Sequence, residues 1–147
     1  MKYFYRALFY PARLYWFLVK PIVYGVGAII EKDGQLLMVR QTYGDRNIWH
    51  FPGGGKKQTE SALDAVTREV KEELGIEATL VKLGEFEETA EHRRVRSTCF
   101  YGIYNGDTII IDPKEIEEAK WCSILNMPEN MSPVAKASFR LYSNLIR

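Results

Sequence analysis

The spacing of hydrophobic residues predicts several buried strands. Apolar runs at residues 22–30 and 36–39 are typical of strands inside a sheet, and the polar turn at residues 32–34 between them indicates a hairpin. Three further strands are expected, at residues 81–86, 98–104 and 108–111, with a tight turn at residues 105–107.

A helical spacing replaces the strand pattern over residues 61–74. Apolar residues recur there every three or four positions, from Leu63 to Leu74, and Gly75 stands where a C-terminal glycine cap belongs. Immediately before this helix, Pro52 is followed by three glycines. This run predicts a loop, because it combines a fixed φ with residues that permit positive φ.

Ser132 and Pro133 provide a cap and a first-turn proline for a final helix. Strands on both sides of one central helix, with a second helix near the end of the sequence, predict an α/β (α+β) fold with a mixed β-sheet sandwiched between helices. A length of 147 residues and a hydrophobic content of 46% fit one main domain, at residues 21–147.

Charge is distributed unevenly along the chain. The formal net charge is +1, but the first 20 residues carry four basic and no acidic side chains, so the remainder carries 16 basic and 19 acidic ones. A basic surface of the kind that binds nucleic acid is therefore not expected. Cys99 and Cys122 lack the spacing of a metal or redox motif, and we expect them to be buried apolar residues of a cytoplasmic protein.

Residues 1–20 are expected to form a separate amphipathic helix. Eight of the first 17 residues are aromatic, and the four basic residues fall within about 40° on a helical wheel. Arg6 and Arg13 interrupt any membrane-spanning pattern, and Pro11 is expected to kink the helix or start a second one. Three partners stay open for this helix: an anionic membrane surface, its own domain, or a second subunit in a homodimer.

Three glutamates of the central helix are candidate metal ligands. Glu69, Glu72 and Glu73 are spaced so that their carboxylates project from one helix face. Such a cluster can also be a solvated acidic face, although carboxylates held close together repel one another unless a cation offsets their charge. Oxygen ligands suit a hard divalent ion such as Mg²⁺, and the preceding glycines let the backbone approach a ligand closely.

The order of these residues resembles the motif of a known family. Gly54, then Glu60 after five residues, then residues 68–76 (REVKEELGI) after seven more, match every defined position of the Nudix box. A match at so many positions should arise by chance in roughly one such chain in ten million.

The resemblance extends beyond the box, from about residue 23 to residue 128. Residues 49–55 resemble the family's lead-in to the box, and residues 118–121 resemble its closing strand. One position departs from the usual pattern, because Thr59 stands where many members have glycine. We expect Thr59 to cap the helix instead.

The resemblance implies a pyrophosphohydrolase in which water attacks phosphorus in a nucleoside diphosphate derivative or a nucleoside triphosphate. The implied cofactor is Mg²⁺, with Mn²⁺ as a substitute. The implied metal ligands are Gly54, Glu69, Glu72 and Glu73. The implied catalytic residues are Glu69 as the base, Arg68 as the group that orients a carboxylate, and Glu60 as the partner of Arg68. A loop carboxylate is an alternative base, with the candidates Glu85, Glu87, Glu88 and Glu91.

Substrate-binding residues are expected on both sides of the box. They are Arg40, Trp49, Arg94 and Arg96. The arginines could bind phosphates, and Trp49 or Tyr43 could stack on a base. The alternatives are a solvated charge run for the arginines and a place in the core for Trp49.

Two other functions stay open on the sequence alone. One is a nucleotide-binding Nudix module without catalysis, which the intact set of glutamates disfavours. The other is a hydrolase of a lipid-linked diphosphate, which would follow if the N-terminal helix bound a membrane. The diphosphate isomerase branch of the family depends on a catalytic cysteine, and neither Cys99 nor Cys122 has the supporting motif.

Overall fold

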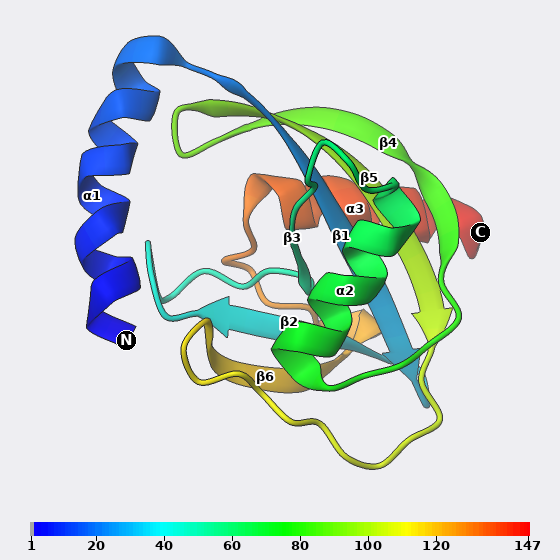
Figure 1. Cartoon of the computed structure of the whole chain (residues 1–147). Helices are drawn as coiled ribbons and strands as arrows, with labels where there is room; N and C mark the ends of the chain where they lie inside the picture. Colours follow the sequence, from blue (N-terminus) through cyan, green and yellow to red (C-terminus); the bar gives the residue numbers. More distant parts are fainter. Residues whose placement is uncertain (1) are drawn as a thin grey trace.

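The structure, a computed structural model, describes residues 2–147, and the side chains of residue 4 and residues 7–147. A twisted mixed sheet has one helix on each side, and a further helix stands at the edge of this body (Figure 1). The elements in chain order are α1 (Lys2–Val19), β1 (Ile22–Lys32), β2 (Gln35–Gln41), β3 (Gly53–Gly55), α2 (Ala62–Leu74), β4 (Val81–Ala90), β5 (Arg93–Ile103), β6 (Ile116–Ser123), the short 3₁₀ helix η1 (Ile124–Asn126) and α3 (Pro133–Leu145). The expected fold class is confirmed.

Strand β1 is the centre of the sheet, whose strand order is β4-β5-β1-β2-β6. It pairs in parallel with β5 along ten residue pairs, from Ile22 opposite Arg94 to Glu31 opposite Ile103. It also pairs antiparallel with β2 at its end and with the short strand β3 near its middle. The glycine segment that precedes α2 is thereby hydrogen-bonded to the central strand of the sheet.

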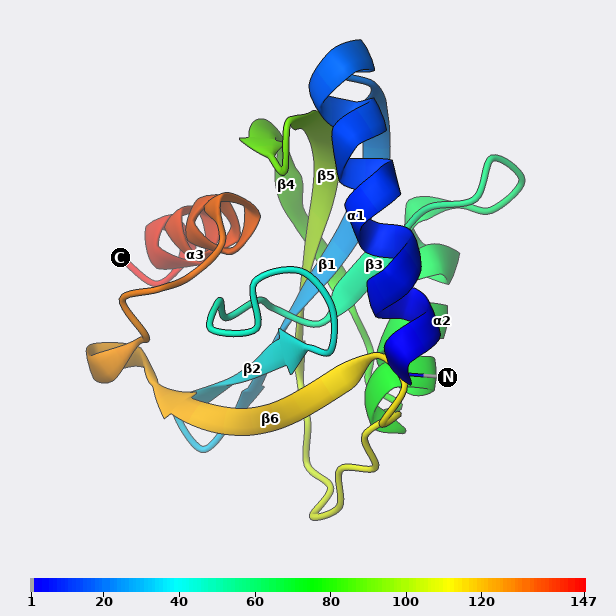
Figure 2. The ribbon, with the colours of Figure 1, turned by 90° about the vertical axis from the view of Figure 1, so that its left-hand side faces the viewer.

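The alternation along β1 and β2 divides the core into two layers. Ala28 and Ile30 of β1 belong to the cluster under α2, whereas Ile29 between them belongs to the cluster under α3. Leu37 and Met38 of β2 divide in the same way. Because side chains of a strand point alternately to opposite faces, both faces of the sheet are apolar and each is covered by a helix (Figure 2).

Local signals set the limits of α2 and α3. Ser61 caps α2 by accepting a hydrogen bond from the Asp64 backbone N–H, and Gly75 ends the helix in the left-handed conformation with φ of 65°. The predicted glycine cap is confirmed, but the cap at Thr59 is wrong, because Ser61 takes that position. Ser132 caps α3 as predicted, by accepting from the Ala135 backbone N–H.

Two expectations about irregular segments are wrong. The glycines after Pro52 do not form only a loop, because Gly53–Gly55 make the strand β3, in which Gly54 lies opposite Val26 of β1. Residues 108–111 do not form a strand. This segment forms a backbone hydrogen bond with the end of α2 instead: the Ile110 N–H donates to the Leu74 carbonyl at 2.9 Å. The carbonyl groups of the last helical turn have no partner within the helix, so they can accept hydrogen bonds from a segment that would otherwise pair in the sheet.

Strands β4 and β5 extend further than expected and form a long hairpin. They meet at a two-residue turn, Glu91-His92, in which both residues have positive φ, 53° and 65°. This combination matches a type I′ turn, whose twist suits two antiparallel strands. The basic residues that follow the turn therefore belong to a regular strand.

Helix α1 runs as one helix through Pro11, so the second helix considered there does not form. It stands beside the beginning of β1 and the β4–β5 turn (Figure 2). No helix in the described residues is long and apolar enough to cross a membrane. Cys99 and Cys122 are free and buried in the layer under α3, as predicted.

Candidate active site

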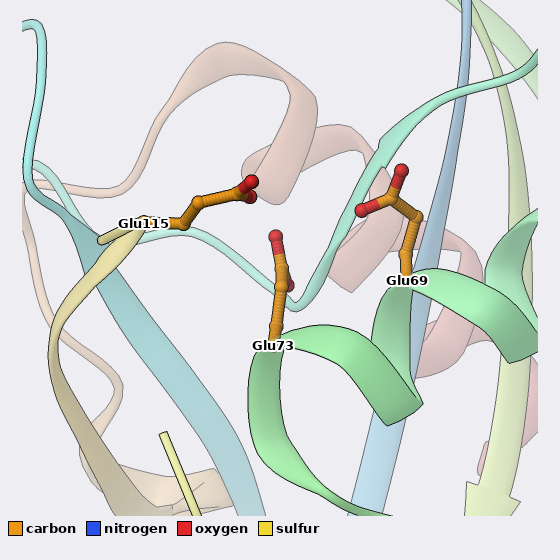
Figure 3. Close-up of side chains that lie close together, drawn as sticks. All are labelled: Glu69, Glu73 and Glu115. Atoms are coloured by element: carbon orange, nitrogen blue, oxygen red, sulfur yellow. The ribbon is translucent and has the colours of Figure 1, made fainter. Parts of the chain in front are cut away.

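Three carboxylates converge beside the glycine strand. Glu69 and Glu73 project from α2, and Glu115 reaches toward them from the segment that precedes β6 (Figure 3). One carboxylate oxygen of each lies within 4.8 Å of those of the other two. The cluster combines two residues that the sequence identified with one that it did not.

Close contact between α2 and β3 holds the two helical carboxylates in place. The Gly53 backbone N–H donates to the Glu73 carboxylate at 3.2 Å. A Cβ at position 54 would stand 2.6 Å from the Glu69 carboxyl carbon, so a side chain there would displace the Glu69 carboxylate. At Gly53, which has φ of 154°, a Cβ would stand 2.1 Å from the Val26 carbonyl oxygen, so the pairing of β3 with β1 requires glycine at that position.

Glu115 is positioned by backbone hydrogen bonds on both sides. The Asp112 N–H donates to the carbonyl of Glu73 at 2.9 Å, which ties the segment to the end of α2. The Glu115 carbonyl accepts from the Thr42 N–H at 2.9 Å, which ties it to the end of β2. These bonds bring together residues that are 42 positions apart in the sequence.

Arg68 links the glutamates on the outer side of the cluster. Its Nε and Nη2 donate to the two oxygens of Glu60, at 3.1 and 2.7 Å, and its Nη1 donates to Glu69 at 2.8 Å and to Glu72 at 3.3 Å. Its Nη2 also reaches the Gly55 carbonyl at 3.2 Å. The expected pair of Arg68 and Glu60 thus forms, and the planar guanidinium fixes the direction of Glu69.

Burial disfavours the ionised form of the three carboxyl groups, Glu69, Glu73 and Glu115. Glu73 is only 3% exposed, and its burial, together with the nearby charge of Glu69, raises its pKa well above the usual range. Burial likewise raises the pKa values of Glu69 and Glu115. In contrast, the hydrogen bonds from Arg68 lower the pKa of Glu60 to about 2.

The donor set fits a hard divalent cation. Among the side chains that the structure describes, no lysine or arginine forms an ion pair with Glu73 or Glu115. Buried carboxylates are normally paired or bind a metal, and three oxygen ligands with room for water and phosphate suit Mg²⁺. Glu72 lies outside the converging group, because its side chain is exposed and contacts Arg68.

A cavity of about 740 Å³ opens on the other side of β3. The backbone of Gly53–Gly55 forms one wall, and the beginning of α3, including Ser132 and Ala135, forms another. Its size is within the range of small-molecule sites. The three carboxylates do not line this cavity, but Gly54 borders it and also lies against the Glu69 side chain.

Helix α1 covers part of this cavity with aromatic rings. Phe9 and Trp16 line it, and Phe9 contacts Tyr43 with ring centroids 5.9 Å apart. The guanidinium of Arg93 lies 3.7 Å from the centre of the Trp16 ring, and its Nε is buried without a hydrogen-bond partner. Burial, with the charge of Glu73 next in weight, raises the pKa of Tyr43, so its hydroxyl stays protonated.

Of the residues predicted for substrate binding, Tyr43 lines the cavity, whereas the other four do not: Arg40, Trp49, Arg94 and Arg96. Arg40 and Trp49 contact each other, and Trp49 is 8% exposed within the layer under α3. Arg94 and Arg96 are both paired with Glu87 on the exposed face of the β4–β5 hairpin. Their roles in substrate binding stay predictions that the geometry does not favour.

The loop carboxylates proposed as alternative bases are engaged elsewhere. Each forms an ion pair within or near the β4–β5 hairpin: Glu85 with Lys82, Glu87 with Arg94 and Arg96, Glu88 with Arg140, and Glu91 with Arg13. None of them belongs to the carboxylate group. The loop carboxylate at the site is Glu115, which no local motif distinguishes from the other glutamates.

Comparison with known proteins gives a consistent result. A family model described as NUDIX domain matches residues 21–143. Nudix hydrolase 5 of Arabidopsis thaliana is 30% identical over 132 residues, which cover 82% of this chain and 43% of that protein. CTP pyrophosphohydrolase of Escherichia coli K12 is 45% identical over 71 residues, which cover 47% of this chain and 49% of that protein. The matches thus span about half the length of these two curated relatives.

Solved structures share the fold. The MutT protein of Methanosarcina mazei Go1 superimposes with a TM-score of 0.73 at 27% sequence identity, and the match covers 88% of this chain and 99% of that one. The MutT Nudix hydrolase of Burkholderia pseudomallei gives a TM-score of 0.71 at 23% identity, over 82% and 97% of the two chains.

Proposed function

The chain belongs to the Nudix family, and on that premise we propose that it is a Mg²⁺-dependent hydrolase that cleaves the diphosphate linkage of a nucleotide. The observation that carries the proposal is the convergence of Glu69, Glu73 and Glu115, with Glu73 buried, beside the glycine strand β3. The same strand forms one wall of a cavity large enough for a nucleotide. A binding module without catalysis has no need to hold three mutually repelling carboxylates so close together.

The reaction we propose is attack of water on phosphorus, with rupture of one P–O bond of the anhydride. A divalent cation held by Glu69, Glu73 and Glu115, with Glu72 and the Gly54 carbonyl as further ligands, would neutralise charge on the phosphates. We assign Glu69 as the acceptor of the proton of the attacking water, because Arg68 fixes the direction of its carboxylate beside the other two. Arg68 holds Glu69 in position, and Glu60 in turn holds Arg68.

We further propose that the nucleoside lies in the cavity under α1, with the diphosphate directed to β3. Phe9 and Tyr43 offer faces on which a base can stack, and the Arg93 guanidinium offers donors to a carbonyl or ring nitrogen. In this assignment the partly buried Arg93 takes the role that the sequence predicted for the exposed residues Arg94 and Arg96. The free buried cysteines agree with the cytoplasmic location expected from the sequence.

The experiment that tests the function measures release of phosphate or pyrophosphate from a panel of substrates. The panel holds nucleoside triphosphates, nucleotide sugars, dinucleotides and prenyl diphosphates, each with Mg²⁺ and with excess chelator. We expect metal-dependent turnover of a nucleotide, and a fall in kcat of about a hundredfold or more in Glu73→Gln. Glu129→Gln, which changes an exposed glutamate remote from the carboxylate group, is the matched control.

Each other outcome supports a different function. Turnover of the prenyl diphosphates alone would contradict the nucleotide substrate and support a lipid-linked one. Binding of a nucleotide with no turnover on the whole panel would contradict catalysis and support the binding module. Equal activity of Glu73→Gln and Glu129→Gln would remove the carboxylate group from the mechanism.

A further inference from the structure

Strand β5 gives the cavity a direction. Arg93, Val95 and Ser97 all line the cavity, because alternate residues of a strand point to the same face. Ser97 lies opposite Gly25 of β1, and Gly25 in turn pairs with Gly55 of β3. Arg93 stands four residues before Ser97, which corresponds to about 13 Å along a strand. The cavity therefore has the glycine strand at one end and Arg93 at the other.

Arg93 brings a positive charge to its end of the cavity without a matching acceptor. Within the described part of the chain it forms no hydrogen bond and no ion pair, and its Nε is buried. Burial lowers the pKa of the Arg93 guanidinium, and the charge of Glu91, which pairs with Arg13, offsets this only in part. A guanidinium has five N–H donors, and donors shielded from water are costly when no acceptor meets them. An occupant that brings acceptors to this end is therefore favoured.

Aromatic rings place a stacking surface beside this guanidinium. The central carbon of the Arg93 guanidinium lies 3.7 Å from the centre of the Trp16 ring, so the guanidinium rests on the ring face. Phe9 contacts both Trp16 and Tyr43, with ring centroids 5.8 and 5.9 Å apart. All three rings line the cavity. A planar group that stacks on one of them can present its edge to the donors of Arg93.

The guanidinium distinguishes among the bases that could stack there. It donates two parallel hydrogen bonds when two acceptors lie side by side. Guanine has such a pair in O6 and N7, and cytosine has one in N3 and O2. Adenine and uracil offer no two neighbouring acceptors on one edge. An arginine in this place therefore favours the first two bases over the other two.

We propose that Arg93 makes the cavity selective for nucleotides of guanine and cytosine over those of adenine and uracil. Arg93 binds the neighbouring acceptors of the base, while the phosphates reach β3 at the other end. Trp16 is a positioning residue, since it holds the guanidinium of Arg93. This selectivity rests on the proposed function, because the occupant of the cavity is then a nucleotide.

The test measures equilibrium binding and not turnover. GMP, CMP, AMP and UMP are titrated into the full chain by calorimetry, since a monophosphate has no anhydride to cleave. We expect GMP or CMP to bind about ten- to a hundredfold more tightly than AMP and UMP, and the separate titrations show which of the two fits. Equal affinity for all four, or binding of none, would overturn the selectivity even if the protein hydrolyses nucleotides. Selective binding without hydrolysis of any nucleotide would contradict the proposed function alone.

Three variants assign the selectivity to Arg93. Arg93→Lys keeps the charge but loses the parallel donors, so its preference for GMP or CMP over AMP should fall to about threefold or less. A purely structural loss would weaken all four ligands equally and would contradict the assignment. Arg140→Gln, at an exposed arginine that pairs with Glu88, is the matched control and should keep the preference of wild type.

Two further results would also overturn the assignment. An undiminished preference in Arg93→Lys would show that charge alone is sufficient. Loss of the preference in Arg94→Gln, with Arg93 intact, would move the selectivity to the exposed face of β5, where Arg94 pairs with Glu87.

Discussion

Glu115 joins the carboxylate group from a segment without a motif, and its function can be tested by a single change of charge. Glu115→Gln keeps the size of the side chain but removes one anionic ligand, so we expect the affinity for Mg²⁺ to fall about 10- to 100-fold. Isothermal titration of Mg²⁺ into the protein measures this directly. The comparison variant is Glu88→Gln, at a carboxylate of β4 that pairs with Arg140. A larger loss of affinity in Glu88→Gln would contradict the site.

His50 gives the fold a dependence on pH that is separate from catalysis. Burial lowers the pKa of His50 to about 4, whereas an unfolded histidine titrates near 6.5. Between these values the unfolded chain binds a proton and the folded chain does not, so the free energy of unfolding decreases as the pH falls from about 6.5 to about 4.

The measurement is urea unfolding of wild type and His50→Gln across this interval of pH. We expect the variant to lose part of the decrease in stability that wild type shows. His92→Gln serves as the control, because His92 is exposed at the β4–β5 turn. If His50→Gln and wild type lose stability in parallel, the histidine is not the group responsible.

At the scale of elements, α1 is expected to affect substrate binding more than the chemical step. Trp16→Leu removes the ring that lies on the Arg93 guanidinium, so the cavity loses one wall and the arginine loses its support. We expect KM to rise about tenfold with kcat nearly unchanged, as for other losses of a stacking ring. Tyr15→Leu, at an exposed residue of the same helix that does not line the cavity, should leave both constants as in wild type. A fall in kcat without a change in KM would contradict this role.

The helices were predictable because their limits depend on nearby residues. The caps Ser61, Gly75 and Ser132 act within four positions of the helix ends that they satisfy, so the sequence contains the whole signal. The strand β3 was not predictable, since three glycines pair with β1 only when α2 brings them to the sheet. The strand predicted at residues 108–111 was wrong for the same reason, because this segment is hydrogen-bonded to the end of α2, which is distant in sequence.

The same distinction holds within the site. Glu69, Glu73, Arg68 and Glu60 lie within 14 residues. Helical spacing predicts that Glu69 and Glu73 share a face, and the resemblance to the Nudix box implies that Arg68 and Glu60 join them. Glu115 and Arg93 come to the site through long-range pairing, of the segment before β6 with α2 and of β5 with β1. The prediction of Arg94 and Arg96 recognised the right charged segment, but alternation along β5 turns Arg93 to the cavity and its neighbour Arg94 away.

For the whole molecule, the buried carboxylates predict opposite effects on stability with and without metal. Free of metal, Glu73→Gln relieves repulsion between like charges and should raise the melting temperature. A saturating cation should stabilise wild type by about 2.7 kcal/mol at a hundredfold excess over Kd, and should stabilise the variant much less. Thermal unfolding with and without Mg²⁺ measures both effects, with Glu129→Gln as the control. Equal shifts on addition of Mg²⁺ would contradict metal binding at this group.

Strand β1 also determines which parts of the molecule open first. It is bonded on both edges, and Ala28, Ile29 and Ile30 are fully buried. Their amide hydrogens should exchange with deuterium only through global unfolding, whereas those of α1 should exchange through local opening, because that helix touches the body by a few side chains. Mass spectrometry of exchanged peptides separates the two classes. The glycine strand β3 is hydrogen-bonded to β1, whereas α1, which covers part of the cavity, is expected to exchange fast. We therefore expect the cavity to open many times between two global unfolding events.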